Sequence, residues 1–313
     1  MRKLSELTSR ECSGLSWSFA TLRRLDSTLL TAISSQALRI IGSFETLDIA
    51  TIAWAYDTLK VLDGPLRDAL AAEALKKGET MDSQPLATLV DINLPGCAPL
   101  QDQLSARITA FADRWKREDA LKASNALLFE WQVDNFGIFG TRLLLSCIGI
   151  GLPGVEFEQR ALQRIAAEEA ARSEDWRKQR FFFKERVHCY AEFALRHPRV
   201  EDADKLQGTM IKENSFLGEG TRAGRTGLLR STSLPINELV DRTLCAEFQT
   251  LAELCDLLDN AGITGKSSRR FVSGKVSLWT TGASCLSCVG TMRQFLQLFP
   301  STTLEVKCAK RFA

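Results

Sequence analysis

The sequence has no long hydrophobic run. None of its 313 residues lies in an uninterrupted apolar stretch of about 18 residues, the length that a transmembrane helix needs. Residues 1–11 carry Glu6 and Glu11 and lack an apolar signal core, so they are typical of neither a secretory signal nor a transit peptide. We therefore expect a protein without a membrane partner.

The chain also lacks an excess of charge of either sign. Its 40 basic and 38 acidic side chains leave a formal net charge of +2, so an argument for a nucleic-acid partner must come from local patches. Apolar residues make up 45% and charged residues 25%, which excludes a largely disordered chain. A globular protein of this length has room for two domains.

Two further patterns are missing. Gly137 and Gly140 do not form a phosphate-binding loop, because their spacing is wrong and no lysine follows. The nine cysteines are odd in number and scattered, apart from the pair Cys285 and Cys288. For a chain of this length, that pattern favours a metal site in a reducing, intracellular compartment over a disulfide framework.

Cys285 and Cys288 stand at the start of an expected helix. Residues 275–280 are predicted as a strand, a short turn follows, and apolar residues then recur at helical spacing. Cysteines three residues apart on a first helical turn point the same way, and the positive helix end lowers their pKa toward the thiolate. Pro300 ends the helix, and residues 303–307 are predicted as another strand.

A second helix is predicted from Leu244 to Leu258. Cys245 and Glu247 lie near its start and off its apolar stripe, whereas Cys255 lies on the stripe and is more plausibly a small core residue than a ligand. Three thiolates around a metal, an open position for water and a separate carboxylate that moves protons make up a zinc hydrolytic site. The two cysteine motifs together therefore predict a site for Zn²⁺.

The strand, the helix that opens on two cysteines and the next strand resemble the second half of the zinc-dependent cytidine deaminase superfamily, especially editing-type members fused to organellar helical repeats. The resemblance covers roughly residues 205–313 and departs at Ser284, where the family usually has proline. It implies an α/β deaminase-like fold with a mixed sheet, and attack of water on C4 of cytosine or C6 of adenine. The implied residues are three metal ligands and one catalytic proton shuttle: Cys245, Cys285, Cys288 and Glu247.

Near the N-terminus the chain repeats itself. Residues 17–26 align with residues 54–63 at an offset of 37 residues, and a third, weaker copy follows. A period of this size with apolar residues at helical spacing predicts stacked helical hairpins. Asp26 and Asp63 are expected to cap the second helix of each hairpin.

The aromatic residues of the two copies also match. Trp17 aligns with Trp54 and Phe19 with Tyr56, and each is more plausibly a core residue than a base-stacking one. Over roughly residues 5–115 the pattern resembles the octatricopeptide-like repeats of organellar RNA-metabolism proteins. That resemblance implies an RNA partner and favours the mitochondrion or plastid as the compartment.

Two basic stretches flank the expected zinc site in the sequence. They lie in residues 218–230 and 266–275, the second within a predicted loop over residues 260–274. Basic loops beside a pocket would hold the phosphates of a single-stranded substrate, whereas each basic residue alone is more readily explained as solvated surface. The candidate substrate-binding residues are Arg222, Arg225, Arg230, Lys266, Arg269 and Arg270.

The middle of the chain is predicted as a connecting region of helices and a strand. Residues 172–186 interleave basic and aromatic side chains as single-strand binders do, but a solvated helix face before a buried strand explains them better. His188 and Glu192 could form a rival half-site. Because Tyr190 stands where the family has a ligand, we interpret His188 as structural.

We therefore expect a helical repeat region at residues 1–133, a connecting region at 134–204 and a deaminase-like zinc domain at 205–313. The expected function is RNA editing, by deamination of cytosine or, as the second choice, adenine in single-stranded RNA, with DNA as the alternative strand. Two other functions stay open. One is an inactive deaminase-like module for RNA binding or assembly, and the other is a free cytidine deaminase.

Overall fold

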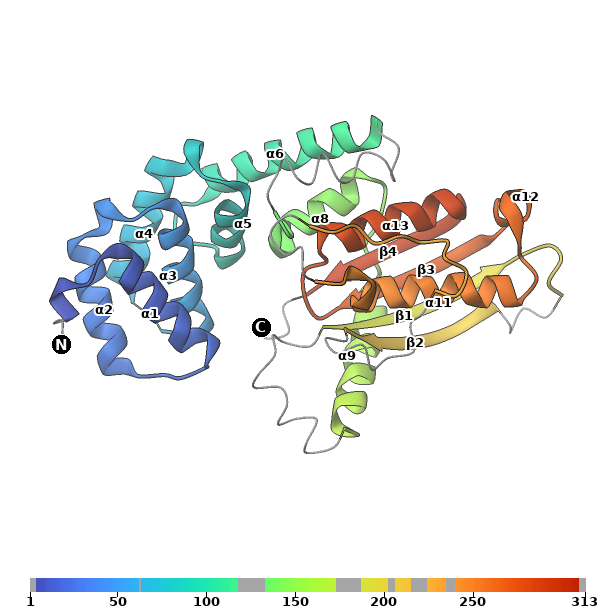
Figure 1. Cartoon of the computed structure of the whole chain (residues 1–313), viewed down its shortest axis with the longest axis horizontal. Helices are drawn as coiled ribbons and strands as arrows, with labels where there is room; N and C mark the ends of the chain where they lie inside the picture. The colour runs from blue at the N-terminus through green and yellow to red at the C-terminus, as the bar shows by residue number, and fades with distance from the viewer. Residues whose placement is uncertain are drawn as a thin grey trace. The chain divides into compact units, whose positions relative to one another are not determined.

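The computed structural model describes residues 4–61, 63–117, 133–172, 187–201, 206–214, 224–234 and 240–309. The chain forms two compact units, Met1–Ile108 and Thr109–Ala313 (Figure 1). The sequence predicted divisions after residues 133 and 204 instead. The described parts contain 11 α-helices and one four-stranded mixed sheet. No helix within them is long and apolar enough to cross a membrane.

The first unit is built from consecutive helices. They are α1 (Ser9–Thr21), α2 (Ser27–Arg39), α3 (Thr46–Thr58), α4 (Gly64–Lys77), α5 (Ser83–Ile92) and the first part of α6 (Ala98–Arg117). Helix α3 begins 37 residues after α1, α4 begins 37 after α2, and α5 begins 37 after α3. The helix starts therefore recur at the offset found in the sequence, while the assignment to a repeat family stays a prediction.

The predicted caps are confirmed. The Asp26 carboxylate accepts a hydrogen bond from the backbone N–H of Leu29 at 3.0 Å, and Asp63 accepts one from Leu66 at 2.9 Å. Each bond satisfies one of the N–H groups that a helix start leaves without a partner. These local rules explain why α2 and α4 start where they do.

The aromatic residues of this unit are not all in the core. Tyr56 is buried, and its hydroxyl donates to the carbonyl of Leu30 at 2.6 Å. Phe19 and Trp54 are half-buried, but Trp17 is 50% exposed, so its expected core position is wrong. Trp17 lies on a side of α1 that the described residues leave uncovered, which a single helix pattern does not reveal.

The second unit contains the sheet. Its strands are β1 (His188–Arg196), β2 (Gln207–Glu213), β3 (Ser273–Thr280) and β4 (Ser301–Cys308), in the order β2-β1-β3-β4. Strand β1 is antiparallel to both β2 and β3, whereas β3 and β4 are parallel and are joined through α13 (Leu286–Leu298). The division predicted after residue 204 falls between β1 and β2, which pair directly.

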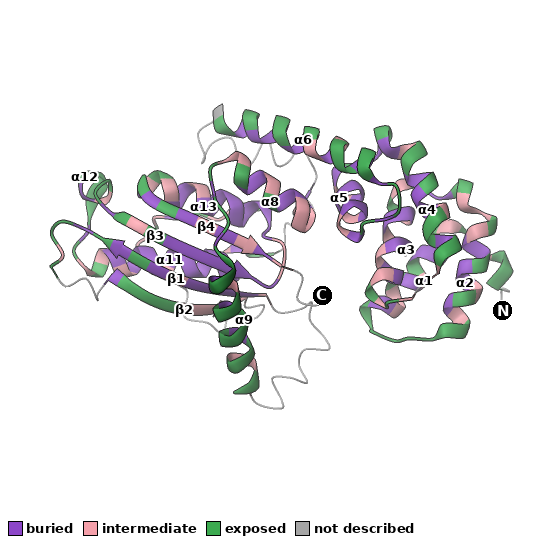
Figure 2. Cartoon of the chain, turned by 180° about the vertical axis from the view of Figure 1, so that it is seen from behind, coloured by how far each residue is buried: buried purple, intermediate pink, exposed green. Residues whose placement is uncertain are grey.

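Helices lie on both faces of the sheet. Helix α13 and helix α11 (Ala246–Asn260) pack on one face, and α9 (Val155–Ala170) packs on the other, in front of the sheet in Figure 2. Tyr190 and Trp279 lie side by side on the α9 face, in one apolar cluster with Phe157 of α9. Because strand side chains alternate, the next residues along β1 and β3 face α11 and α13.

Two further helices refine the sequence predictions. Helix α8 (Gly137–Cys147) lies in the region that was expected to connect the two domains. The loop expected over residues 260–274 is wrong in part, because it contains the one-turn helix α12 (Gly265–Arg269). The buried Ser268 ties this turn to the sheet through a hydrogen bond between its hydroxyl and His197 at 3.2 Å.

Candidate metal centre

Three cysteine sulfurs converge at the starts of two helices. Cys245 is the N-terminal cap of α11, Cys285 is the cap of α13, and Cys288 lies on the first turn of α13. The sulfur atoms all lie within 4.8 Å of one another. Both caps have extended backbone, and neither side chain bonds its own helix, so the sulfurs are free to face each other. The structure thus brings together the three cysteines that the sequence singled out.

The three thiols form one hydrogen-bonded network. Hydrogen bonds from Cys245 and Cys288 hold the pKa of Cys285 well below the usual thiol value, although burial opposes this. Donating hydrogen bonds to Cys245 and Cys285 raises the pKa of Cys288, and donating to Cys285 raises the pKa of Cys245. The lowering expected for both cysteines at the helix start is therefore wrong for Cys288. Three thiolates within 4.8 Å of one another repel, so a bound cation would stabilise the fully ionised set.

These donors fit a zinc ion. Sulfur ligands at bonds of about 2.3 Å in a tetrahedron lie roughly 3.8 Å apart, a separation compatible with three sulfurs that all lie within 4.8 Å of one another. Thiolates also favour soft metals such as zinc over magnesium or calcium. Three protein ligands leave one tetrahedral position open, which is the arrangement of catalytic rather than structural zinc sites.

Glu247 lies beside the three sulfurs but is not part of the metal-ligand cluster. It is 3% exposed, and the Cys288 thiol donates to its Oε2 atom at 3.6 Å. Burial, followed by the nearby charge of Cys285, raises the pKa of Glu247 to about 7, while hydrogen bonds from Ser284 and Cys288 act in the opposite direction. A carboxyl group with a pKa near neutrality can both accept and donate a proton.

Two more cysteines line the sheet beneath Glu247. Cys189 of β1 and Cys308 of β4 lie on either side of Thr280, on the face of the sheet that carries α11 and α13. Burial raises the pKa of both thiols, so neither is a reactive thiolate near neutral pH. Ser284 lies 3.4 Å from the Cys308 sulfur and is fully buried. Sequence patterns did not indicate these neighbours, because they come from strands far apart in the chain.

An arginine–aspartate pair also borders the centre. Arg242 is 8% exposed and lies in a single 3₁₀ turn just before Cys245. Its guanidinium donates to the Asp134 carboxylate at 2.7 Å, and its charge acts on Cys285 and Cys245. Sequence reasoning missed both residues. The position of Arg242 three residues before Cys245 was a usable signal, whereas Asp134 had none.

The expected basic residues lie elsewhere. Helix α11 is about 22 Å long at 1.5 Å per residue, with Cys245 at its start. The Arg225 side chain donates to Asn260 at the other end of α11, and α12 follows from there. Lys266, Arg269 and Arg270 therefore lie far from the three sulfurs, at the opposite end of the strands (Figure 1).

The other two candidate substrate-binding residues are Arg230 and Arg222. Arg230 is exposed, and its backbone exchanges two hydrogen bonds of 2.9 Å with the side chain of Gln294, more than two turns from the start of α13. Arg222 and residues 173–186 lie outside the described residues. No basic residue proposed for substrate binding is therefore placed at the centre by the described part of the chain.

His188 has a structural environment. It is fully buried on the α9 face, with Glu169 and Glu213 at 3.6 and 3.5 Å from its two ring nitrogens. Within the described ranges, the three cysteines are the one group of His, Cys, Asp or Glu side chains that is close enough for a metal. This agrees with the interpretation of His188 as structural.

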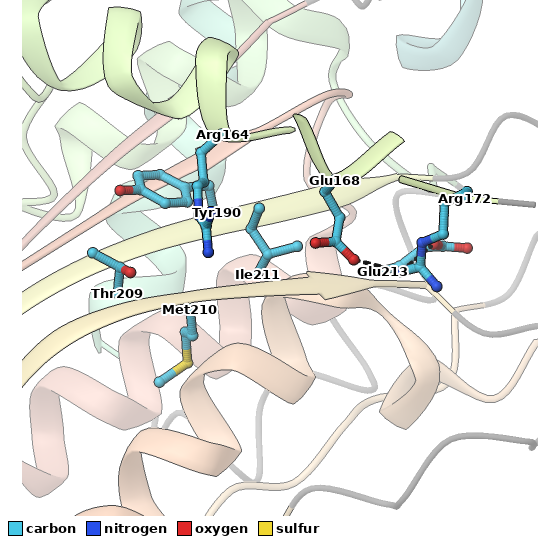
Figure 3. Close-up of a pocket in the computed structure, with 8 residues that line it drawn as sticks. All are labelled: Arg164, Glu168, Arg172, Tyr190, Thr209, Met210, Ile211 and Glu213. Atoms are coloured by element: carbon cyan, nitrogen blue, oxygen red, sulfur yellow. Dashed lines mark ion pairs between the residues drawn. The ribbon is translucent and has the colours of Figure 1, made fainter. Parts of the chain in front are cut away.

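A polar pocket of about 250 Å³ lies near His188, between α9 and β2 (Figure 3). Arg172 pairs there with Glu168 at 3.1 Å and with Glu213 at 3.5 Å, so its charge is already balanced. The pocket opens on the face of the sheet opposite to Cys285 and Glu247. Its other lining residues are Arg164, Tyr190, Thr209, Met210 and Ile211.

Comparison of the chain with protein-family models, with curated proteins and with solved structures finds no match. The interpretation of the centre therefore rests on its own chemistry: three sulfurs in position for one metal ion and a separate buried carboxyl group beside them.

Proposed function

We propose that the second unit is a zinc-dependent hydrolytic deaminase that acts on cytosine, with adenine as the second choice of base. The observation that carries the proposal is the position of Glu247 against a cluster of three thiols. A purely structural zinc site has four protein ligands and needs no carboxyl group held near neutrality. Three ligands and a proton-transfer group are instead the parts that hydrolysis requires.

The residues divide the chemistry between them. Cys245, Cys285 and Cys288 would hold zinc, which when bound lowers the pKa of a water molecule toward neutrality. Glu247 would accept a proton from that water and deliver it to the ring nitrogen of the base. It would then pass a proton to the amino group, so that water adds at C4 and ammonia leaves.

The substrate is proposed to be single-stranded RNA, with DNA as the alternative, and the compartment to be a mitochondrion or plastid. The support for RNA is the resemblance of the first unit to octatricopeptide-like repeats together with the 37-residue recurrence of its helix starts. The candidate basic side chains lie away from the sulfurs, so they supply no support for a strand beside the metal. The alternative, a free cytidine deaminase, would act on the nucleoside without needing residues 1–115.

One observation favours a second candidate, a module that binds a metal but does not catalyse. Cys288 is 1% exposed, Glu247 is 3% exposed and Cys285 is 7% exposed, and only Cys245 is partly open, so the described residues leave little of the centre accessible to a base. Deamination requires this site to open. A non-catalytic role in RNA binding or assembly does not.

The deciding experiment measures turnover and bound zinc together on the full chain. Purified protein is incubated with single-stranded RNA, single-stranded DNA and free cytidine, and conversion of cytosine to uracil is followed by mass spectrometry. The variant Glu247→Gln should abolish conversion and still bind zinc. Glu253→Gln, on the same helix but half exposed and paired with Lys212, is the matched control and should remain active.

The outcomes separate the candidates. Conversion of RNA that Glu247→Gln abolishes supports the editing function, whereas conversion of free cytidine without conversion of RNA indicates a nucleoside enzyme. Zinc bound in full stoichiometry without turnover of any of the three substrates supports the non-catalytic module. Absence of zinc from the wild-type protein overturns the proposal as a whole.

A further inference from the structure

The carbonyl and the carboxylate of Asp134 reach both halves of the metal centre. Its carbonyl oxygen accepts a hydrogen bond from the backbone N–H of Leu286, the first residue of α13, at 2.8 Å. Its carboxylate accepts the guanidinium of Arg242 at 2.7 Å, just before α11 begins. One residue therefore joins the starts of the two helices that carry the sulfurs.

The position of Asp134 is itself fixed by packing. Val133 and Phe136 on either side are fully buried, and the ring of Phe136 packs against Phe111 with a centroid separation of 5.5 Å. Buried neighbours hold a backbone segment to a narrow range of positions because interiors are close-packed. Asp134 is thus a rigid attachment point rather than the tip of a loose loop.

Charge explains why an arginine is needed at this place. Three thiolates around a divalent cation leave one net negative charge, and an isolated charge in a buried site is costly unless it is paired. Arg242 lies in the turn that leads into Cys245, and its partner Asp134 is bonded to the residue after Cys285, so its positive charge lies near the starts of both helices. Asp134 holds the guanidinium in place, while the guanidinium offsets the charge of the ligands.

One N–H donor of the Arg242 guanidinium is not satisfied within the part of the chain that the structure describes. Its Nε atom is buried and has no hydrogen-bond acceptor among the described residues. An arginine presents its donors in a planar fork, so one nitrogen can bind a carboxylate while another faces a sulfur. An ionised ligand sulfur is the acceptor that this nitrogen lacks.

We propose that Arg242 and Asp134 are positioning residues of the metal centre: Asp134 holds the guanidinium against the cysteine ligands, and the guanidinium stabilises the ionised ligand set and its metal. This inference rests on the metal-binding part of the proposed function, and it does not require catalysis. Outer partners of metal ligands commonly contribute a factor of about 10–100 in metal affinity. We expect Arg242 and Asp134 together to contribute a factor of that size to zinc affinity.

The test measures zinc affinity of the full chain by competition with a coloured chelator, and ligand geometry by the absorption spectrum of the cobalt-substituted protein. Arg242→Gln should weaken zinc binding by about 10–100-fold and leave the cobalt spectrum that of a three-sulfur site. Arg242→Lys keeps the charge and should recover part of the loss. Asp134→Asn keeps the shape of the side chain and should also weaken binding.

A double-mutant cycle tests whether the two residues act together. If they do, Asp134→Asn should cost little further affinity once Arg242→Gln is present. The matched control is Arg160→Gln, which breaks the 2.8 Å ion pair of Arg160 with Glu192 on the other face of the sheet. That variant should bind zinc as the wild type does.

The experiment distinguishes failure of the positioning role from failure of the proposed function. Zinc binding by the wild type with unchanged affinity in both Arg242→Gln and Asp134→Asn overturns the positioning role and leaves the zinc site intact. A wild-type protein that binds no zinc overturns the proposed function as well. If Arg242→Gln does not fold, as judged by circular dichroism, the result for Asp134→Asn decides, since that change removes only the carboxylate charge.

Discussion

The thiol of Cys288 donates to the Glu247 carboxylate at 3.6 Å, and both side chains are almost entirely enclosed. A proposed metal ligand and a proposed proton carrier are thus in direct contact. The contact couples their properties, because ionising either group changes the charge next to the other. The two side chains nevertheless have different proposed roles, since Cys288 holds the metal and Glu247 moves protons. Mutation of each residue can distinguish these roles.

Removing a ligand sulfur should remove the metal. In Cys288→Ser we expect zinc stoichiometry to fall well below that of the wild type, because a hydroxyl is a much poorer zinc ligand than a thiolate. Cys255→Ser is the matched control, because Cys255 on α11 is as buried as Cys288 but lies outside the cluster. Elemental analysis of the purified variants gives the answer, and equal zinc in all three proteins would contradict the ligand set.

Replacing the carboxyl group should stop chemistry without releasing zinc. We expect Glu247→Gln to lower kcat by about 10²–10⁴-fold, the usual contribution of a general acid–base group. Zinc content should stay at the wild-type level, because Glu247 does not belong to the cluster of sulfurs. Steady-state assays on the substrate identified for the wild type measure the effect, and an undiminished kcat would rule out a proton-transfer role.

The stability of the second unit should depend on pH through Asp256, a mostly buried residue on α11. Burial tends to raise its pKa, but the backbone N–H groups of Thr226, Arg225 and Gly224, at about 3.0 Å, outweigh this and the pKa is lowered. A carboxylate with a lowered folded pKa stabilises the protein above its unfolded pKa of about 3.9. That stability is lost as the pH falls through the folded value.

Asp256→Asn should therefore destabilise the second unit at neutral pH. We expect a loss of about 1–3 kcal/mol in the free energy of unfolding, the range for hydrogen bonds to a charged group. The difference from the wild type should shrink below about pH 4, where the Asp256 carboxylate of the unfolded chain takes up a proton, and should vanish below the lowered pKa of the folded state. Urea unfolding at pH 7 and at acidic pH measures both quantities, and a difference that grows toward low pH would contradict the assignment.

Gly274 should not tolerate a side chain. Its φ angle is +117°, and a Cβ atom there would lie 2.2 Å from the carbonyl oxygen of Ala194 on the neighbouring strand. Gly274→Ala should cost at least about 2 kcal/mol, because the strained backbone and the clash both oppose it. Gly282→Ala, where the nearest atom is at an ordinary 3.6 Å, should cost much less. Thermal unfolding of the two variants provides the comparison.

Local patterns anticipated much of the architecture. Helix α13 begins at the paired cysteines, the strands on either side of it are present, and Asp26 and Asp63 cap their helices. Each of these features depends on residues within a few positions of one another. Capping, helical periodicity and the stop at Pro300 operate over that range, so a single sequence is enough to reveal them.

Longer-range features were not readable in the same way. The sequence placed basic residues on either side of the cysteine motifs, yet the 15-residue helix α11 separates Arg225 and α12 from the sulfurs, at the far end of the strands. Neighbours in the chain became distant in space because a straight helix separates its two ends. Trp17 was likewise expected inside, and only the arrangement of the other helices left it half exposed.

What the chain order alone established is therefore the chemical type of the centre: two helices that open on cysteine, with a glutamate two residues after the first. What the tertiary structure decided is which other groups surround it. Asp134 and Arg242 are 108 residues apart in the chain and meet at 2.7 Å. No local periodicity encodes such a contact, because it arises when separate segments pack around one sheet and bury their charges together.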